Sequence, residues 1–122
     1  MIGIGLDLCQ VERIESAIAS TGFLERYYTP AEREYITGRG KMGPQSAAAM
    51  FAAKEAFLKA MGSGIDGQIR LSEIGVIHDQ SGAPRYQLTG AALERLCQLG
   101  GKTVHLTLTH ENGMAAAVAI IE

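Results

Sequence analysis

The sequence has few cysteines and little net charge, and both scarcities exclude classes of protein. Its two cysteines, Cys9 and Cys97, lie far apart and match no metal-binding or redox spacing, so we expect two reduced, partly buried thiols. The formal net charge of −2 provides no general attraction to nucleic acid. Any anionic ligand must therefore be bound by a local cluster of cationic or amide groups.

Long apolar runs are also missing. The longest, Ala47 to Ala53, is far shorter than the ~20 residues that span a bilayer. The first residues contain no basic segment followed by an apolar stretch, which a signal peptide would need. We therefore expect a cytoplasmic protein with no membrane segment.

What the chain does contain is enough apolar material for a core. Apolar residues make up 47% of its 122 residues, a share that excludes a disordered chain. Domains cluster around ~100–150 residues. We therefore predict a single domain over residues 1–122.

The first half begins with a strand and continues in helices. Alternation over Ile2–Asp7 predicts a strand with Asp7 at its end, and its two glycines leave backbone bare for close packing or for a ligand. The apolar period changes to that of a helix at Val11, and Gly22 ends it. Thr29-Pro30-Ala31-Glu32 predicts a capped helix start.

The centre and the second half of the chain complete the fold prediction. After a mobile surface loop over Gly38–Pro44, the composition predicts a long helix over Gln45–Met61 that Gly62 ends. The remaining predicted elements are strands at Ile74–His78, Pro84–Leu88, Thr103–Thr109 and Met114–Ile121, and a helix at Ala91–Leu99. This order indicates an α+β fold, with a mostly antiparallel sheet packed against a long central helix and shorter helices.

A candidate phosphate site lies at the end of the long helix. Glu55 and Lys59 are one turn apart and can simply form a surface pair. However, Lys59 is close to the Gly62-Ser63-Gly64 turn, whose amides can bind phosphate oxygens. A carboxylate beside phosphate needs a bridging cation, and Mg²⁺ takes one or two carboxylates together with phosphates and waters. Asp7 is the best-placed second carboxylate, although it can also cap the helix that starts near Val11.

Three motifs in order resemble those of one enzyme family. They are Gly3-Ile4-Gly5-Leu6-Asp7 followed by Arg13-Ile14, Phe51-Ala52-Ala53-Lys54-Glu55-Ala56-Phe57-Leu58-Lys59-Ala60 with Gly62-Ser63-Gly64, and Thr109-His110-Glu111 followed by Ala115-Ala116-Ala117. Together they resemble the holo-[acyl-carrier-protein] synthases, the short, trimeric branch of the 4′-phosphopantetheinyl transferases. The resemblance covers essentially the whole chain.

The resemblance implies an activity in fatty acid and lipid biosynthesis. The 4′-phosphopantetheine arm of coenzyme A would move to a serine of apo-acyl carrier protein, releasing adenosine 3′,5′-bisphosphate. It also implies a homotrimer with active sites between neighbouring subunits. The alternative is a non-catalytic coenzyme A- or nucleotide-binding module, which would leave the paired carboxylates without a purpose.

Site roles follow from the same resemblance. Asp7 and Glu55 would bind Mg²⁺, and Glu55 is also a candidate for removing the serine proton. Lys59 would contact the pyrophosphate or help activate the serine. The other implied contacts are Gly62, Ser63 and Gly64 at the phosphates, His110 near the nucleotide end of coenzyme A, and Arg13 at the carrier protein.

One position departs from the family pattern. The family often has a basic residue where this chain has Met50, and Arg39 or Lys41 in the preceding loop is a candidate replacement for its charge. Two further histidines have weaker claims to a role. We expect His78 to be a solvated surface residue. His105 shares a strand face with Thr107 and Thr109, and a subunit contact or the nucleotide site beside that face is the less favoured interpretation.

Overall fold

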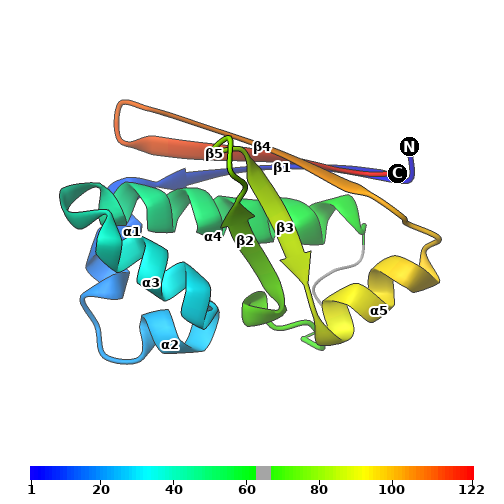
Figure 1. Cartoon of the computed structure of the whole chain (residues 1–122), viewed down its shortest axis with the longest axis horizontal. Coiled ribbons are helices and arrows are strands. Elements are labelled where there is room, and N and C mark those ends of the chain that lie inside the picture. Colours follow the sequence, from blue (N-terminus) through cyan, green and yellow to red (C-terminus); the bar gives the residue numbers. More distant parts are fainter. Residues whose placement is uncertain (63–66) are drawn as a thin grey trace.

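The computed structural model describes residues 1–62 and 67–122, and a three-stranded antiparallel sheet forms one layer of it. The strand order is β1-β5-β4, with β1 at Gly3–Gln10, β4 at Val104–Glu111 and β5 at Met114–Ile121. The strands β1 and β4 therefore flank β5, although they lie at opposite ends of the sequence (Figure 1). The chain turns between β4 and β5 at Asn112 and Gly113, which both have positive φ, as the Asn-Gly pair favours.

The long helix α4, Gly43–Ala60, lies along one face of this sheet (Figure 1). Gly3 and Gly5 allow the contact, because a Cβ at either position would collide with the carbonyl oxygen of Ala60 or Ala56. The face of β5 that points to the helix is also built from small residues, the buried Ala115, Ala117 and Ala119. Small side chains on β1 and β5 therefore set how closely the helix approaches the sheet.

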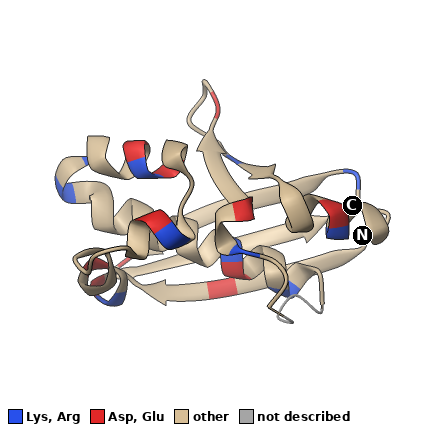
Figure 2. Cartoon of the chain, turned by 90° about the horizontal axis from the view of Figure 1, so that it is seen from below, with Lys and Arg blue, Asp and Glu red and all other residues tan. Residues whose placement is uncertain are grey.

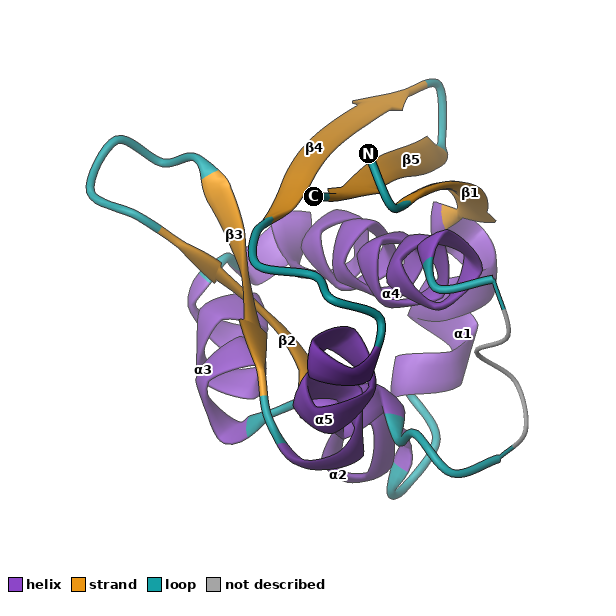
Figure 3. Cartoon of the chain, turned by 90° about the vertical axis from the view of Figure 1, so that its right-hand side faces the viewer, coloured by secondary structure: helices purple, strands orange, loops and turns teal. Residues whose placement is uncertain are grey.

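The other helices lie on the side of α4 away from this sheet, while a second, smaller sheet flanks α4 and reaches β4 (Figure 3). A two-stranded antiparallel sheet pairs β2, Ile74–His78, with β3, Pro84–Leu88. The helices are α1 at Val11–Ile18, α2 at Phe23–Tyr27, α3 at Pro30–Gly38 and α5 at Gly90–Gln98, with short 3₁₀ turns η1 at Gly40–Met42 and η2 at Leu71–Glu73.

The start of α3 shows how local sequence and long-range packing combine. Thr29 and Glu32 form the predicted capping box, in which the Thr29 N–H donates to Glu32 Oε1 at 2.8 Å and the Glu32 N–H donates to Thr29 Oγ1 at 3.1 Å. Glu32 is nevertheless fully buried, and the Lys54 ammonium of α4 donates to the same carboxylate at 2.7 Å. Glu32 therefore both caps α3 and binds α4 through a buried ion pair.

The predicted fold class is confirmed, but several element boundaries are wrong. Asp7 lies within β1, which continues to Gln10, because the strand pairs with β5 along its whole length. The first helix ends at Ile18 rather than Gly22, and α2 follows it without a strong pattern of its own. The segment predicted as a mobile loop, Gly38–Pro44, is helical throughout except at Arg39: it contains the end of α3, η1 and the first turn of α4.

Charge and cysteine placement agree with the small net charge and the scarcity of thiols. Lys and Arg are interspersed with Asp and Glu over the helices (Figure 2). Both cysteines are free and Cys9 is buried, but Cys97 is exposed on α5, so the expected burial of Cys97 is wrong. No helix in the described ranges is long and apolar enough to cross a membrane.

Candidate active site

Three predicted site residues meet where β1 crosses α4. Asp7 lies on the same face of β1 as Gly5 and Cys9, the face that packs on the helix. Lys59 donates to Asp7 Oδ1 at 3.0 Å and to the Leu6 carbonyl at 3.1 Å. Among the described residues Lys59 forms no ion pair with Glu55, so the surface pair that the helical spacing suggested is not present.

Glu55 lies beside this ion pair, and the charges of the pair shift the pKa of its carboxyl. Partial burial raises the pKa of the Glu55 carboxyl, and the negative charge of Asp7 raises it further. The charges of Lys59 and Arg13 lower the same pKa without reversing the shift. The two carboxylates are therefore close enough to repel each other, and a cation between them would relieve that repulsion.

The donor set suits a particular kind of metal. Within residues 1–62 and 67–122, no group of three or more His, Cys, Asp and Glu side chains is arranged to hold a metal ion. Two carboxylates alone do not make a zinc site, which takes three or four protein ligands. They do fit Mg²⁺, which keeps several waters and takes further oxygens from a phosphorylated substrate. Asp7 and Glu55 therefore fit the predicted metal.

Arg13 extends the cluster toward α1. Its guanidinium lies 3.9 Å from Cys9 Sγ and 6.0 Å from the centre of the Phe51 ring. Burial raises the pKa of the Cys9 thiol, so Cys9 is the small buried side chain that the sequence predicts. The structure thus brings Arg13 beside Glu55 through packing against Cys9 and Phe51, a neighbourhood that helical spacing alone does not reveal.

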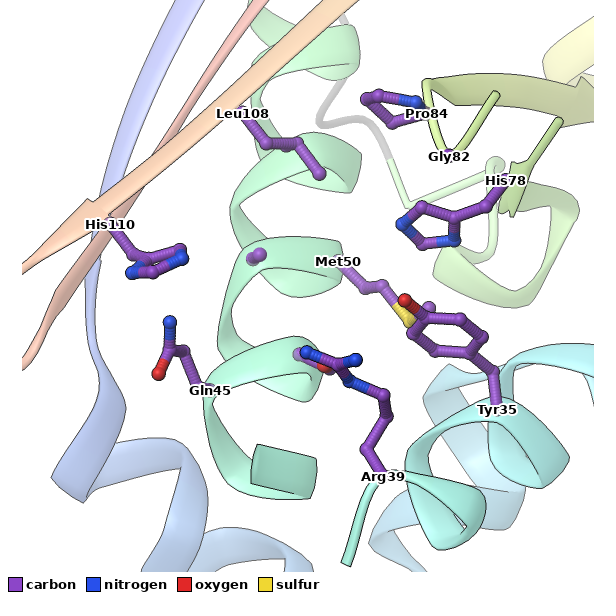
Figure 4. Close-up of a pocket in the computed structure, with 11 residues that line it drawn as sticks. Tyr35, Arg39, Gln45, Met50, His78, Gly82, Pro84, Leu108 and His110 are labelled. Carbon is purple, nitrogen blue, oxygen red and sulfur yellow. The ribbon is translucent and has the colours of Figure 1, made fainter. Parts of the chain in front are cut away.

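His110 lies in a different place, at a pocket of about 240 Å³ between α4, β4 and the β2–β3 turn (Figure 4). The pocket is lined by Tyr35, Arg39, Gln45, Ser46, Ala49, Met50, His78, Gly82, Pro84, Leu108 and His110. None of Asp7, Glu55 and Lys59 contributes to it. In one chain, α4 therefore has a carboxylate cluster on its β1 side and this pocket on its β4 side.

His78 is the clearest error among the predicted surface residues. Its ring stacks on Tyr35 with 4.4 Å between centroids, and its Nδ1 is buried without a hydrogen-bond partner among the described atoms. Burial lowers the pKa of His78, and the charge of Arg39 lowers it further. Sequence reasoning missed this residue because its neighbours come from α3, more than 30 residues away along the chain.

The predicted glycine turn is only partly described. Gly62 follows α4 with a φ of 77°, and its N–H donates to the Lys59 carbonyl at 3.0 Å. Ser63 and Gly64 lie outside the described residues. A phosphate site at this turn stays a prediction.

Comparison with known proteins gives one consistent result. A sequence model of the 4′-phosphopantetheinyl transferase superfamily matches residues 3–119. A holo-[acyl-carrier-protein] synthase of Treponema denticola is 43% identical over 122 residues, which cover 100% of this chain and 98% of the relative.

Solved structures agree. The crystal structure of the holo-[acyl-carrier-protein] synthase of Neisseria meningitidis is 35% identical, with a TM-score of 0.87 and coverage of 100% of this chain and 98% of that one. The Helicobacter pylori synthase, solved in complex with coenzyme A, is 28% identical with a TM-score of 0.82, covering 98% of this chain and 99% of that one.

Proposed function

The chain belongs to the 4′-phosphopantetheinyl transferase superfamily, and we propose that its holo-[acyl-carrier-protein] synthase activity depends on a Mg²⁺ ion held by Asp7 and Glu55. The reaction transfers the 4′-phosphopantetheine arm of coenzyme A to a serine of apo-acyl carrier protein. The serine oxygen forms a new bond to the phosphorus that bears the arm. The bond from that phosphorus to the bridging pyrophosphate oxygen breaks, and adenosine 3′,5′-bisphosphate leaves.

The observation that best supports this proposal is the junction of Asp7, Glu55 and Lys59 between β1 and α4. Phosphoryl-type transfer requires positioned groups and neutralised charge more than covalent chemistry from the protein. Bound Mg²⁺ would supply the neutralising charge at the pyrophosphate. Lys59, whose side chain is half-exposed, can move from Asp7 to a phosphate oxygen and orient it.

The serine proton also needs an acceptor. Glu55 is a candidate because its raised pKa makes the carboxylate a better base than an ordinary glutamate. Glu55 can serve in this role or as a metal ligand. The two assignments differ in one measurable respect: a metal ligand controls the affinity for Mg²⁺, whereas a base that does not touch the metal leaves that affinity unchanged.

We propose that the nucleotide end of coenzyme A binds at the pocket lined by His110. The carboxylate cluster and this pocket lie on different sides of α4, which favours an active site shared between the cluster of one subunit and the pocket of a neighbour. The outer face of β1 supports such an assembly, since Ile4, Leu6 and Leu8 are 58–62% exposed. They continue across the sheet onto apolar β5 residues, namely Ile120, Val118 and Ala116. Exposed apolar faces of this kind mark subunit contacts, and a homotrimer is the assembly we propose.

The carrier protein would dock at α1. Arg13 is exposed on this helix and lies against Phe51, next to the carboxylate cluster, so an acidic partner held there would bring its serine close to Glu55. The proposal also treats residues 1–122 as one transferase domain that acts in the cytoplasm.

The test measures arm transfer by mass spectrometry of the carrier after incubation with coenzyme A and Mg²⁺. Asp7→Ala and Glu55→Ala should keep the wild-type circular dichroism spectrum and lose transfer by at least about 100-fold, as expected when a group that stabilises transition-state charge is removed. Glu94→Ala, which removes a surface carboxylate of α5, should transfer at the wild-type rate.

Wild-type turnover by either carboxylate variant would contradict the metal assignment. Removal of Mg²⁺ with a chelator separates the transferase from a simple binding module. The module would hold coenzyme A equally well without the metal and would add no mass to the carrier. Dissociation of the oligomer with retained activity would contradict the shared site.

A further inference from the structure

The charges around Asp7 balance one another without any metal ion. Asp7 and Glu55 contribute two carboxylates, and Lys59 and Arg13 are the cations whose charges reach Glu55 among the described residues. The affinity of an oxygen site for a divalent cation depends on how many negative charges its ligands carry. This carboxylate cluster has no excess of negative charge, so by itself it attracts a divalent cation only weakly.

Lys59 is already bound to one of the two carboxylates that the metal needs. Its ammonium lies 3.0 Å from Asp7 Oδ1 and donates to the neighbouring Leu6 carbonyl at 3.1 Å, so two of its three donors point to β1. Asp7 is only 17% exposed, and its charge is therefore less screened by water than that of an open surface carboxylate. A metal ion that binds Asp7 must compete with the Lys59 ammonium.

Of the two cations, Lys59 is the one that can move. The Arg13 guanidinium is held between Cys9 Sγ at 3.9 Å and the Phe51 ring, whose centre is 6.0 Å away. The Lys59 side chain is 51% exposed and sits on a flexible stem near the end of α4. Because an exposed ion pair contributes little free energy, its ammonium can leave Asp7 for another anion.

The charges of the two ligands compensate each other at this cluster. Mg²⁺ adds two positive charges, and the pyrophosphate of coenzyme A adds one negative charge on each of its two phosphates. Either ligand alone leaves the cluster with an unbalanced charge, which costs free energy in a partly buried place. Both ligands together restore neutrality, and the phosphates also give the displaced Lys59 ammonium a new partner.

We propose that Lys59 is the counter-ion of Asp7 in the metal-free protein, that Mg²⁺ and Lys59 compete for this carboxylate, and that the competition makes Mg²⁺ and coenzyme A bind cooperatively. The proposal rests on the function proposed above. It gives Lys59 a task before any chemistry, namely to keep the metal affinity low until a phosphate is present to take the ammonium.

The first experiment measures Mg²⁺ binding by calorimetry at one ionic strength, without coenzyme A and without carrier protein. Lys59→Met should bind Mg²⁺ more tightly than wild type, by roughly 3- to 10-fold, because the competing ammonium and its repulsion of the ion are both removed. Lys102→Met is the matched control, since it removes the same charge at an exposed position elsewhere, and it should keep the wild-type affinity.

A companion variant separates the charge of Lys59 from its packing. Lys59→Arg keeps a cation that can pair with Asp7, so its affinity for Mg²⁺ should be no higher than that of wild type. Circular dichroism confirms that each variant is folded. An Lys59→Met variant that binds Mg²⁺ no more tightly than wild type would contradict the competition, and so would an equal gain in Lys59→Arg.

The second experiment repeats the Mg²⁺ titration with protein saturated by coenzyme A, after subtraction of a titration of coenzyme A alone. Coenzyme A should raise the affinity of wild type for Mg²⁺ by at least about 10-fold, and Mg²⁺ should raise the affinity for coenzyme A by the same factor, because such coupling is reciprocal. In Lys59→Met the factor should be at least about 3-fold smaller, since no ammonium passes from Asp7 to the phosphates. An equal factor in both proteins would contradict the proposed role of Lys59.

These binding measurements involve no turnover, so they keep the inference separate from the proposed function. If wild type transferred no arm but Lys59→Met gained affinity for Mg²⁺ and lost cooperativity, the transferase assignment would fail and the competition would stand. If wild type transferred the arm but Lys59→Met and wild type bound Mg²⁺ equally well, the competition would fail and the transferase assignment would stand.

Discussion

Two lysines of α4 form ion pairs with carboxylates from distant parts of the chain, and their surroundings are opposite. The pair of Lys54 with Glu32 measures 2.7 Å, and both side chains are 0% exposed. The pair of Lys59 with Asp7 measures 3.0 Å, with side chains 51% and 17% exposed. The same two chemical groups are thus present once in the core and once at the surface of a single helix.

The buried pair is fully provided with hydrogen bonds. Lys54 also donates to the carbonyls of Leu71 and Ile74, at 3.1 and 2.8 Å. Glu32 also accepts from the N–H groups of Thr29 and Val76, each at 2.8 Å. Burial lowers the pKa of Lys54, and the charge and hydrogen bonds of Glu32 oppose part of that shift. This network ties α3, α4 and β2 to one another, so its role is structural.

Within the part of the chain that the structure describes, the exposed pair makes one additional bond, from Lys59 to the Leu6 carbonyl. A half-exposed ammonium with few partners can exchange a carboxylate for a ligand phosphate at little energetic cost. The difference teaches that desolvation, rather than the type of residue, separates the pair that holds the fold from the pair available for chemistry.

Removing the buried carboxylate should cause the largest change in stability of all the variants considered. Glu32→Ala leaves the Lys54 ammonium in the core without its counter-charge, and we expect a loss of about 3–5 kcal/mol in the free energy of unfolding. Urea denaturation measures it. Glu34→Ala, on the exposed side of the same helix, is the matched control and should change this free energy by less than about 0.5 kcal/mol. A loss in Glu32→Ala no larger than in this control would show that the pair is not structural.

Variants at both Glu32 and Lys54 measure how much of the loss in the free energy of unfolding comes from the unpaired charge. Glu32→Gln removes the charge but keeps one acceptor oxygen, so the amide of either Thr29 or Val76 loses its acceptor. Lys54→Met fills a similar volume without charge. We expect the double variant to be more stable than the sum of the single losses predicts, by about 1–3 kcal/mol. A double-mutant cycle in urea provides the number, and strict additivity would contradict a direct coupling between the two side chains.

These pairs also show what the sequence does and does not predict. The Thr29–Glu32 box was predictable because both partners lie within one helical turn, and the Asn112-Gly113 turn was predictable because it needs positive φ at two adjacent positions. The attachment of Glu32 to Lys54 was not, since it joins residues 22 positions apart through packing that has no local pattern.

For the candidate site, too, the types of residue were predictable from the sequence, whereas their contacts in space were not. The chemistry of a glutamate and a lysine near a glycine turn called for a second carboxylate, and the family motif singled out Asp7. The contact of Asp7 with Lys59 depends on the register of β1 against β5 and on the two glycines that admit α4. The ring stack of Tyr35 on His78 depends on α3 and β2 meeting in space, so the sequence alone gave it no signal.

The surface pair should affect activity far more than stability. Lys59→Met removes its ion pair, and we expect the free energy of unfolding to change by less than about 0.5 kcal/mol, in line with other exposed pairs. Arm transfer should nevertheless fall by at least about 10-fold, because a positioned charge at the phosphates is lost. Urea denaturation and the mass-spectrometric assay test the two halves separately. A stability loss comparable to that of Glu32→Ala would place Lys59 with the structural pair instead.

The smallest expected effect is a gain in stability rather than a loss, and it depends on pH. The folded protein raises the pKa of Glu55 above its unfolded value, chiefly by burial, so the ionised carboxylate destabilises the fold. Both states are protonated well below the unfolded pKa of ~4.3, where Glu55 has no effect, and stability declines as the pH rises through the folded pKa. Glu55→Gln should therefore be more stable than wild type at neutral pH, by less than about 1 kcal/mol, and equal to it near pH 3.

Thermal unfolding of Glu55→Gln and wild type at these two pH values measures the effect, and Glu94→Gln controls for the removal of one surface charge. Added Mg²⁺ should reverse the order at neutral pH, because an ion that binds only the folded wild type raises its stability by mass action. If Mg²⁺ stabilised wild type and Glu55→Gln equally, Glu55 would not be a ligand and would be left with the role of base. A destabilised Glu55→Gln without metal would mean that the carboxylate supports the fold, as Glu32 does, and would remove the contrast between the two sides of α4.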